Sequence, residues 1–77
     1  MGNNIEKSVL DNIAEKASFI AEMEKIERKR EQFAQADGRC AYLNGMAYVL
    51  EMFGYIFQYK DDTHIFIDTI ENVVNKK

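Results

Sequence analysis

The chain has 77 residues, with ten basic and thirteen acidic side chains and a net charge of −3. This length allows a single domain with a thin core, because so short a chain buries only about 60% of its unfolded surface. The acidic balance disfavours a nucleic-acid binder. Cys40 is the only cysteine, and no Cys/His cluster suits structural zinc, so we expect no internal disulfide and no cofactor. Another copy of the chain is the remaining way to supplement the core.

The opening residues MGNNIEKSVL lack the basic region and continuous apolar stretch of a secretory signal. Glu6 stands where a myristoylation motif has Ser or Thr. A single thiol fits a reducing compartment. We therefore expect a cytoplasmic protein, and the size and composition suit a bacterial or phage accessory protein.

A first helix is predicted from just after Asn3 to about Gln35. Asn3 can cap it, with Glu6 in the capping-box position three residues on. Its first half carries apolar residues at spacings of three and four, which is typical of a buried helical stripe: Leu10, Ile13, Ala17 and Ile20. Most residues from 22 to 32 are charged, so the second half is expected to be solvated.

A second helix is predicted from about Gly38 to Tyr59, after a tight turn over residues 36–39. Its last twenty residues, from Cys40, contain one charge, Glu51. The small or polar residues of this run share one narrow helical face: Asn44, Ala47, Glu51, Gly54 and Gln58. A membrane span is disfavoured, because a central charge costs about 2.5 kcal/mol or more on insertion. Glu51 is a candidate proton carrier if buried, but its place on the polar face predicts exposure.

The C-terminal part is predicted to form a short third helix after the polar break at residues 60–63. Apolar and polar residues there both recur at spacings of three and four. A C-terminal β-hairpin is the alternative, since residues 55–59 and 63–70 are rich in aromatic and β-branched side chains and Gly54 can end the second helix. The predicted fold is therefore all-α: a helical hairpin of a long and a medium helix plus a short C-terminal helix, assembling as an oligomeric helical bundle.

The second helix lacks apolar cover in this arrangement. Folding back at Gly38 places its first half beside the charged section of the first helix, so its apolar side chains stay exposed. Gly38, Ala41 and Gly45 form a seam of small residues along which another helix can approach closely. We expect a homodimer or higher oligomer through the following interface residues: Tyr42, Leu43, Gly45, Met46, Val49, Leu50 and Phe53.

Basic residues suggest a site for a nucleotide or small anion. Guanidinium groups bind phosphate and aromatic rings stack on bases, so the candidates are Arg28, Arg30, Arg39 and Tyr42. Glutamates interleaved with the arginines favour a solvated, salt-bridged helix instead. Three tyrosines at helical spacing, Tyr48, Tyr55 and Tyr59, are candidates for a pocket or for the core.

No catalytic constellation stands out. His64, Asp61 and Asp68 share a face if this segment is helical, which permits a metal site, but capping acids on a solvated face explain the pattern better. Cys40 suits a buried structural thiol better than a nucleophile. The sequence thus predicts a non-enzymatic regulatory or interaction protein that homo-oligomerises and binds a protein partner. The alternative is a small-ligand binder with pockets at subunit interfaces, and a DNA-binding module is disfavoured by charge.

Overall fold

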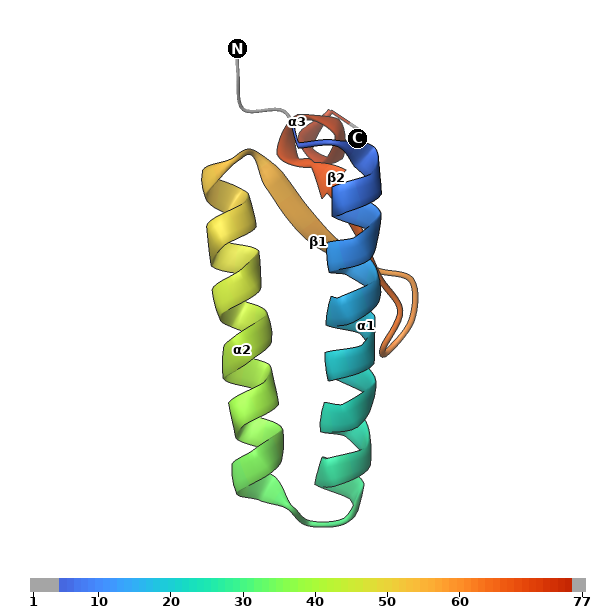
Figure 1. Cartoon of the computed structure of the whole chain (residues 1–77), viewed down its shortest axis with the longest axis vertical. Coiled ribbons are helices and arrows are strands. Elements are labelled where there is room, and N and C mark those ends of the chain that lie inside the picture. The colour runs from blue at the N-terminus through green and yellow to red at the C-terminus, as the bar shows by residue number, and fades with distance from the viewer. Residues whose placement is uncertain (1–4, 76–77) are drawn as a thin grey trace.

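The computed structural model describes residues 5–75, which form a helical hairpin backed by a β-hairpin. The two long helices, α1 (Lys7–Lys29) and α2 (Phe33–Met52), run antiparallel side by side. Two short antiparallel strands follow, β1 (Tyr55–Tyr59) and β2 (Ile65–Thr69), and then a single-turn helix, α3 (Ile70–Val74). The strands lie against one face of the helical pair, β2 against α1 and β1 against α2 (Figure 1).

The two long helices and the short C-terminal helix of the predicted fold are confirmed, but the chain is not all-α, because the C-terminal β-hairpin given as the alternative also forms. Gly54 has φ 90°, a left-handed conformation that glycine adopts without strain, and it ends α2. The strands pair from Tyr55 with Thr69 to Tyr59 with Ile65. Side chains at odd-numbered positions of both strands share the face toward the helices, where Tyr55 and Ile65 are buried. The backbone pairing therefore places these residues on a strand, whereas the three-four spacing of the polar residues was coincidental.

The turn between the helices lies at residues 30–32, and its predicted position at 36–39 is wrong. Glu31 takes a left-handed φ of 60°. The Gln32 amide donates to the Glu27 carbonyl at 2.8 Å, and the Glu31 amide donates to the Arg28 carbonyl at 3.1 Å. This pair of bonds is a Schellman motif, which usually has glycine in place of Glu31. Gly38 instead lies inside α2, because the packing of α2 on α1 outweighs the weak helix preference of glycine.

The N-terminal boundary of α1 is Lys7. Glu6 precedes it in extended conformation and makes no side-chain capping bond. Asn3, the predicted cap, lies outside the described residues.

The core forms where both helices and β2 meet. Ala17, Ile20 and Ala21 of α1 pack with Leu43 of α2 and Ile65 of β2, and Met46 and Phe57 close around them. Among the described residues, nine apolar side chains are buried and four of these are alanines. Alanines let the elements approach closely, but they bury little apolar area, so the core is small for the chain.

Ser18 fixes the β-hairpin to α1. Its hydroxyl accepts a hydrogen bond from the Ile65 amide at 2.8 Å and donates one to the Ala14 carbonyl at 2.9 Å. The outer edge of β2 is thus satisfied by a helix side chain at the point where the strand begins. An edge amide left unpaired here would lose its contact with water without compensation.

Candidate interaction surface

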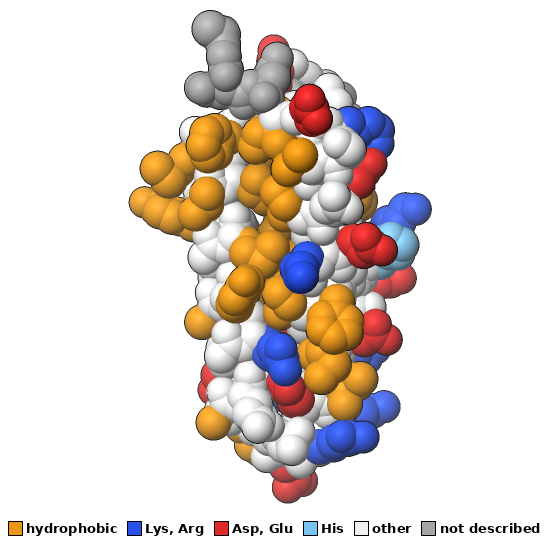
Figure 2. All heavy atoms as spheres, in the orientation of Figure 1, with side chains coloured by type: hydrophobic (Ala, Val, Ile, Leu, Met, Phe, Trp, Pro, Cys, Tyr) orange, Lys and Arg blue, Asp and Glu red, His pale blue; other side chains and the backbone are white. Residues whose placement is uncertain are grey.

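The two faces of the α1–α2 layer differ in their cover. The β-hairpin lies behind the helices in Figure 1, so the face turned to the viewer is open. Figure 2 shows hydrophobic side chains over the upper part of α2 and between the helices, with a separate group over the lower part of α1, while most charged side chains in view lie to one side, along α1. Several large apolar side chains of this face are exposed, among them Phe19, Tyr42 and Val49.

The open side of α2 carries a complete seam at heptad spacing. Its members are separated by three and four residues and none of them is charged: Gln35, Gly38, Tyr42, Gly45, Val49 and Met52. Exposure is high at the large members, with 61% for Tyr42, 52% for Val49 and 70% for Met52. The intramolecular seam of the same helix runs one residue further along the sequence, through the buried Ala36, Leu43 and Leu50. The buried seam is covered within the chain, whereas the exposed seam has no apolar surface against it.

The predicted interface residues divide between these two seams. Leu43 and Leu50 are buried within the chain, and Met46 packs against the core. The remaining members are exposed: Tyr42, Gly45, Val49 and Phe53. The division follows from the turn at Glu31, which brings Ile20 and its neighbours opposite Leu43 and so gives α2 apolar cover within the chain.

No close approach within the chain requires either glycine of the exposed seam. A Cβ added at Gly38 or Gly45 would meet no atom within 4 Å. Each glycine inside a helix costs about 1 kcal/mol relative to alanine, because glycine loses more backbone freedom on folding. No close packing within the chain offsets that cost, whereas the close approach of a second backbone would offset it.

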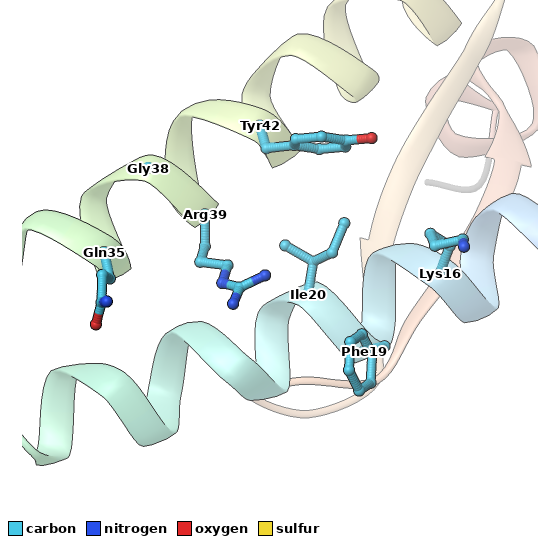
Figure 3. A pocket seen from close by; sticks show the side chains of 7 residues that line it. All are labelled: Lys16, Phe19, Ile20, Gln35, Gly38, Arg39 and Tyr42. Atoms are coloured by element: carbon cyan, nitrogen blue, oxygen red, sulfur yellow. The ribbon is translucent and has the colours of Figure 1, made fainter. Parts of the chain in front are cut away.

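A hollow of about 490 Å³ lies between the helices on the open face. Figure 3 shows Arg39 and Tyr42 reaching from α2 toward α1, and Ile20 reaching toward them from α1. Its wall is completed by four further residues: Lys16, Phe19, Gln35 and Gly38. The structure therefore brings together two of the predicted ligand residues, Arg39 and Tyr42. Lys16 was missed, although its spacing from Ile20 and Phe19 places it on the same side of α1.

Arg39 is held by an acidic partner on α1. Its guanidinium donates to the Glu27 carboxylate at 3.0 and 3.2 Å, and these bonds raise the pKa of Arg39 above its ordinary value. Glu27 is only 7% exposed. Lys16 makes no ion pair with any described residue, so it is the less engaged cation of the hollow.

The other two predicted ligand residues lie elsewhere. Arg28 donates to Glu24 at 2.9 Å and to Asp37 at 3.3 Å, and these bonds raise its pKa. Arg30 is the exposed residue that follows α1. The basic cluster is therefore divided between a salt-bridged helix end and the hollow, as the interleaved acids indicated.

Asp61 and His64 belong to the loop of the β-hairpin, so their predicted helical face with Asp68 does not form. One oxygen of Asp61, Oδ1, accepts hydrogen bonds from the Thr63 and His64 amides at 2.9 and 2.8 Å. These bonds stabilise the carboxylate and lower the pKa of Asp61. The role visible for Asp61 is to shape the turn.

The remaining candidates are dispersed. Tyr55 is buried and its hydroxyl accepts from the Ile5 amide at 3.2 Å, whereas Tyr48 and Tyr59 are exposed, so the tyrosines do not line one pocket. Partial burial raises the pKa of Tyr59. Cys40 is a half-buried free thiol. Glu51 is exposed, as predicted.

Residues 5–75 contain no group of three side chains placed to hold a metal ion. Over the same range, no helix is both long and apolar enough to cross a bilayer. No family model, curated protein or solved structure matches this chain.

Proposed function

We propose that the chain is a non-enzymatic interaction protein that self-associates through the open face of α1 and α2 and, as an oligomer, binds a protein partner. The observation that carries this proposal is the uncharged seam along the open side of α2, in which Tyr42, Val49 and Met52 are 61%, 52% and 70% exposed. Soluble monomers rarely expose several large apolar side chains along one helix face without a partner.

The chemistry of the open face fits a second copy. The exposed seam of α2 contains no charged residue, although 30% of the chain is charged. Apolar surface of this kind is stabilised by removal from water in proportion to its area. A second copy supplies an identical uncharged face, which is the arrangement of a twofold symmetric interface.

A different surface supports the protein partner. Between α1 and β2 lies a hollow of about 580 Å³, whose wall includes two exposed phenylalanines, Phe19 and Phe66, and the carboxylates of Glu15 and Glu22. Neither glutamate is ion-paired within the described residues. An apolar segment with basic side chains would complement both the rings and the charge.

Binding of a small anion is the second candidate function, and Lys16 is the observation that favours it. Lys16 lacks an ion-pair partner within residues 5–75 and lines the same hollow between the helices as Tyr42 and Arg39. Calorimetric titration with ATP and with inorganic phosphate tests this function. Binding that Lys16→Met removes would support it, and the absence of heat with both probes would eliminate these ligands. Lys16→Met is preferable to a change at Arg39, which would leave the buried Glu27 unpaired.

The self-association proposal is tested by two matched variants of α2 in sedimentation velocity over a concentration series. Val49→Glu places a charge in the exposed seam, and Asn44→Glu places the same charge on the other exposed side of the helix. We expect dimers for the wild type and for Asn44→Glu. Val49→Glu should sediment as a folded monomer, with at least a 100-fold weaker dimer, because a carboxylate would be desolvated in the interface.

Circular dichroism shows whether each variant keeps its helices. A wild type that stays monomeric at every concentration contradicts the proposal. A Val49→Glu dimer as tight as the wild-type dimer would show that another face is used.

A further inference from the structure

The sizes of the side chains along the exposed seam of α2 determine how two copies of the helix can align. This inference rests on the self-association proposed above. We propose that two copies pair their α2 helices antiparallel about a twofold axis between Leu43 and Asn44. Tyr42 then packs over Gly45 of the partner subunit, and Val49 packs over Gly38 of the partner subunit. Gln35 faces the partner's Met52 at the ends.

The size of the side chains along the seam selects this register. In an antiparallel pair, positions at equal distance from the axis on opposite sides face each other. Tyr42 and Gly45 are equidistant from the proposed axis, and so are Gly38 and Val49. Each large side chain thus meets the open space above a glycine, where a Cβ would touch no atom of its own chain beyond the adjacent residues and the local helix backbone. This is the large-to-small complementarity by which facing helices pack without voids.

Other arrangements fail at identifiable positions. A parallel pair in register places Tyr42 on the partner's Tyr42 and glycine opposite glycine, which gives a clash beside voids. Shifting the antiparallel pairing by one heptad, which moves the axis by about half a heptad toward the N-terminus, carries Val49 past Phe33, where the partner helix begins. The opposite one-heptad shift of the pairing, which moves the axis by about half a heptad toward the C-terminus, places Tyr42 against the partner's Met52 and carries Gly38 past the end of α2. Antiparallel pairing also sets the two helix dipoles in opposite directions, which is the favourable arrangement.

The pairing would also cover the hollow between the helices. Gly38 and Tyr42 both line that hollow and both belong to the seam. A partner side chain seated on Gly38 therefore lies at the mouth of the hollow. The twofold axis repeats the contact, so both hollows close and no unpaired copy of the seam remains.

Cysteine crosslinking between two differently tagged chains tests the register. Both chains carry Cys40→Ala to remove the native thiol, one also carries Gly38→Cys, and the other carries Val49→Cys. We expect the mixture to give a mixed disulfide dimer under mild oxidation and each protein alone to give none. In the proposed register, identical positions 38 lie about 16 Å apart along the axis, as do identical positions 49. A disulfide requires Cα atoms within about 7 Å.

A second pair, Gln35→Cys mixed with Met52→Cys, reports the same register if a thiol at position 38 hinders association, because identical positions in it lie about 25 Å apart along the axis. Crosslinking of Gly38→Cys with itself would indicate a parallel pair and overturn the inference. Dimers that sediment normally but crosslink in neither mixture would overturn the register and leave self-association standing. A chain that remains monomeric would overturn self-association itself, so the two failures are distinct.

Discussion

The two seams of α2 both lack charged residues but lie in opposite environments. Ala36, Leu43 and Leu50 are buried against α1 and the β-hairpin, while Tyr42 and Val49, one residue earlier in each heptad, are exposed. A shift of one residue along a helix is a rotation of 100°, which is enough to move a side chain from the core to solvent. Apolar character therefore shows that a face needs a partner, and the topology decides whether that partner lies in the same chain.

Among the substitutions that test the difference between the two seams, Leu43→Ala should have the largest effect on stability. Leu43→Ala should lower the free energy of unfolding by about 3 kcal/mol, because it removes a side chain that is 5% exposed and leaves a cavity. The adjacent Tyr42→Ala is the matched control. It should change monomer stability by no more than about 0.5 kcal/mol. Urea denaturation in the monomeric concentration range measures both, and equal losses would contradict the assignment of the two seams.

The attachment of the β-hairpin gives the next largest effect. Ser18→Ala should cost roughly 1.5 kcal/mol, since the Ile65 amide loses its acceptor at 2.8 Å. Ser8→Ala, an exposed serine of the same helix, corrects for the higher helix preference of alanine. Thermal unfolding of the two variants gives the difference. Equal stability would show that the hydroxyl contributes nothing to docking the strand.

Replacement of Gly45 in the exposed seam should have opposite effects on the stability of the monomer and on the strength of the dimer. Gly45→Ala should stabilise the monomer by about 1 kcal/mol, because the new Cβ meets no neighbour and alanine favours the helix. It should also weaken self-association, since the methyl group fills the space proposed for the partner's Tyr42. Gly54→Ala is the contrasting control and should destabilise the chain, because φ is 90° there. Denaturation and sedimentation together separate the two effects, and tighter dimerisation of Gly45→Ala would contradict this account.

The smallest effect concerns acid sensitivity of the hairpin loop. The Thr63 and His64 amides hold the pKa of Asp61 below its usual value, so its stabilisation is present at neutral pH. That contribution is lost as the pH falls through the lowered pKa. Asp61→Asn keeps an acceptor oxygen without titrating. Between about pH 6 and about pH 2.5, the melting temperature of the variant should fall slightly less than that of the wild type, and an identical fall would exclude this role.

Sequence reasoning found the two long helices and the excess apolar surface of the second, because both follow from periodicity. It missed the turn at Glu31, since a glutamate in left-handed conformation has no sequence signature and Gly38 offered a false one. It preferred a helix where the β-hairpin forms, because loop and strand residues happened to share helical spacing. The position of the turn then decided which residues of α2 face α1. For that reason Leu43 and Leu50 could not be separated from Tyr42 and Val49 before the fold was known.

The most direct test of the central claim is an isotope-filtered nuclear Overhauser experiment on a mixture of labelled and unlabelled chains. It detects only contacts between different copies. We expect intermolecular signals from the Tyr42 ring to the α protons of the partner's Gly45, and from the methyl groups of Val49 to the partner's Gly38. Intermolecular signals confined to the strands, or none at a concentration where the wild type sediments as a dimer, would contradict the claim that the open face of α2 is covered by a second copy.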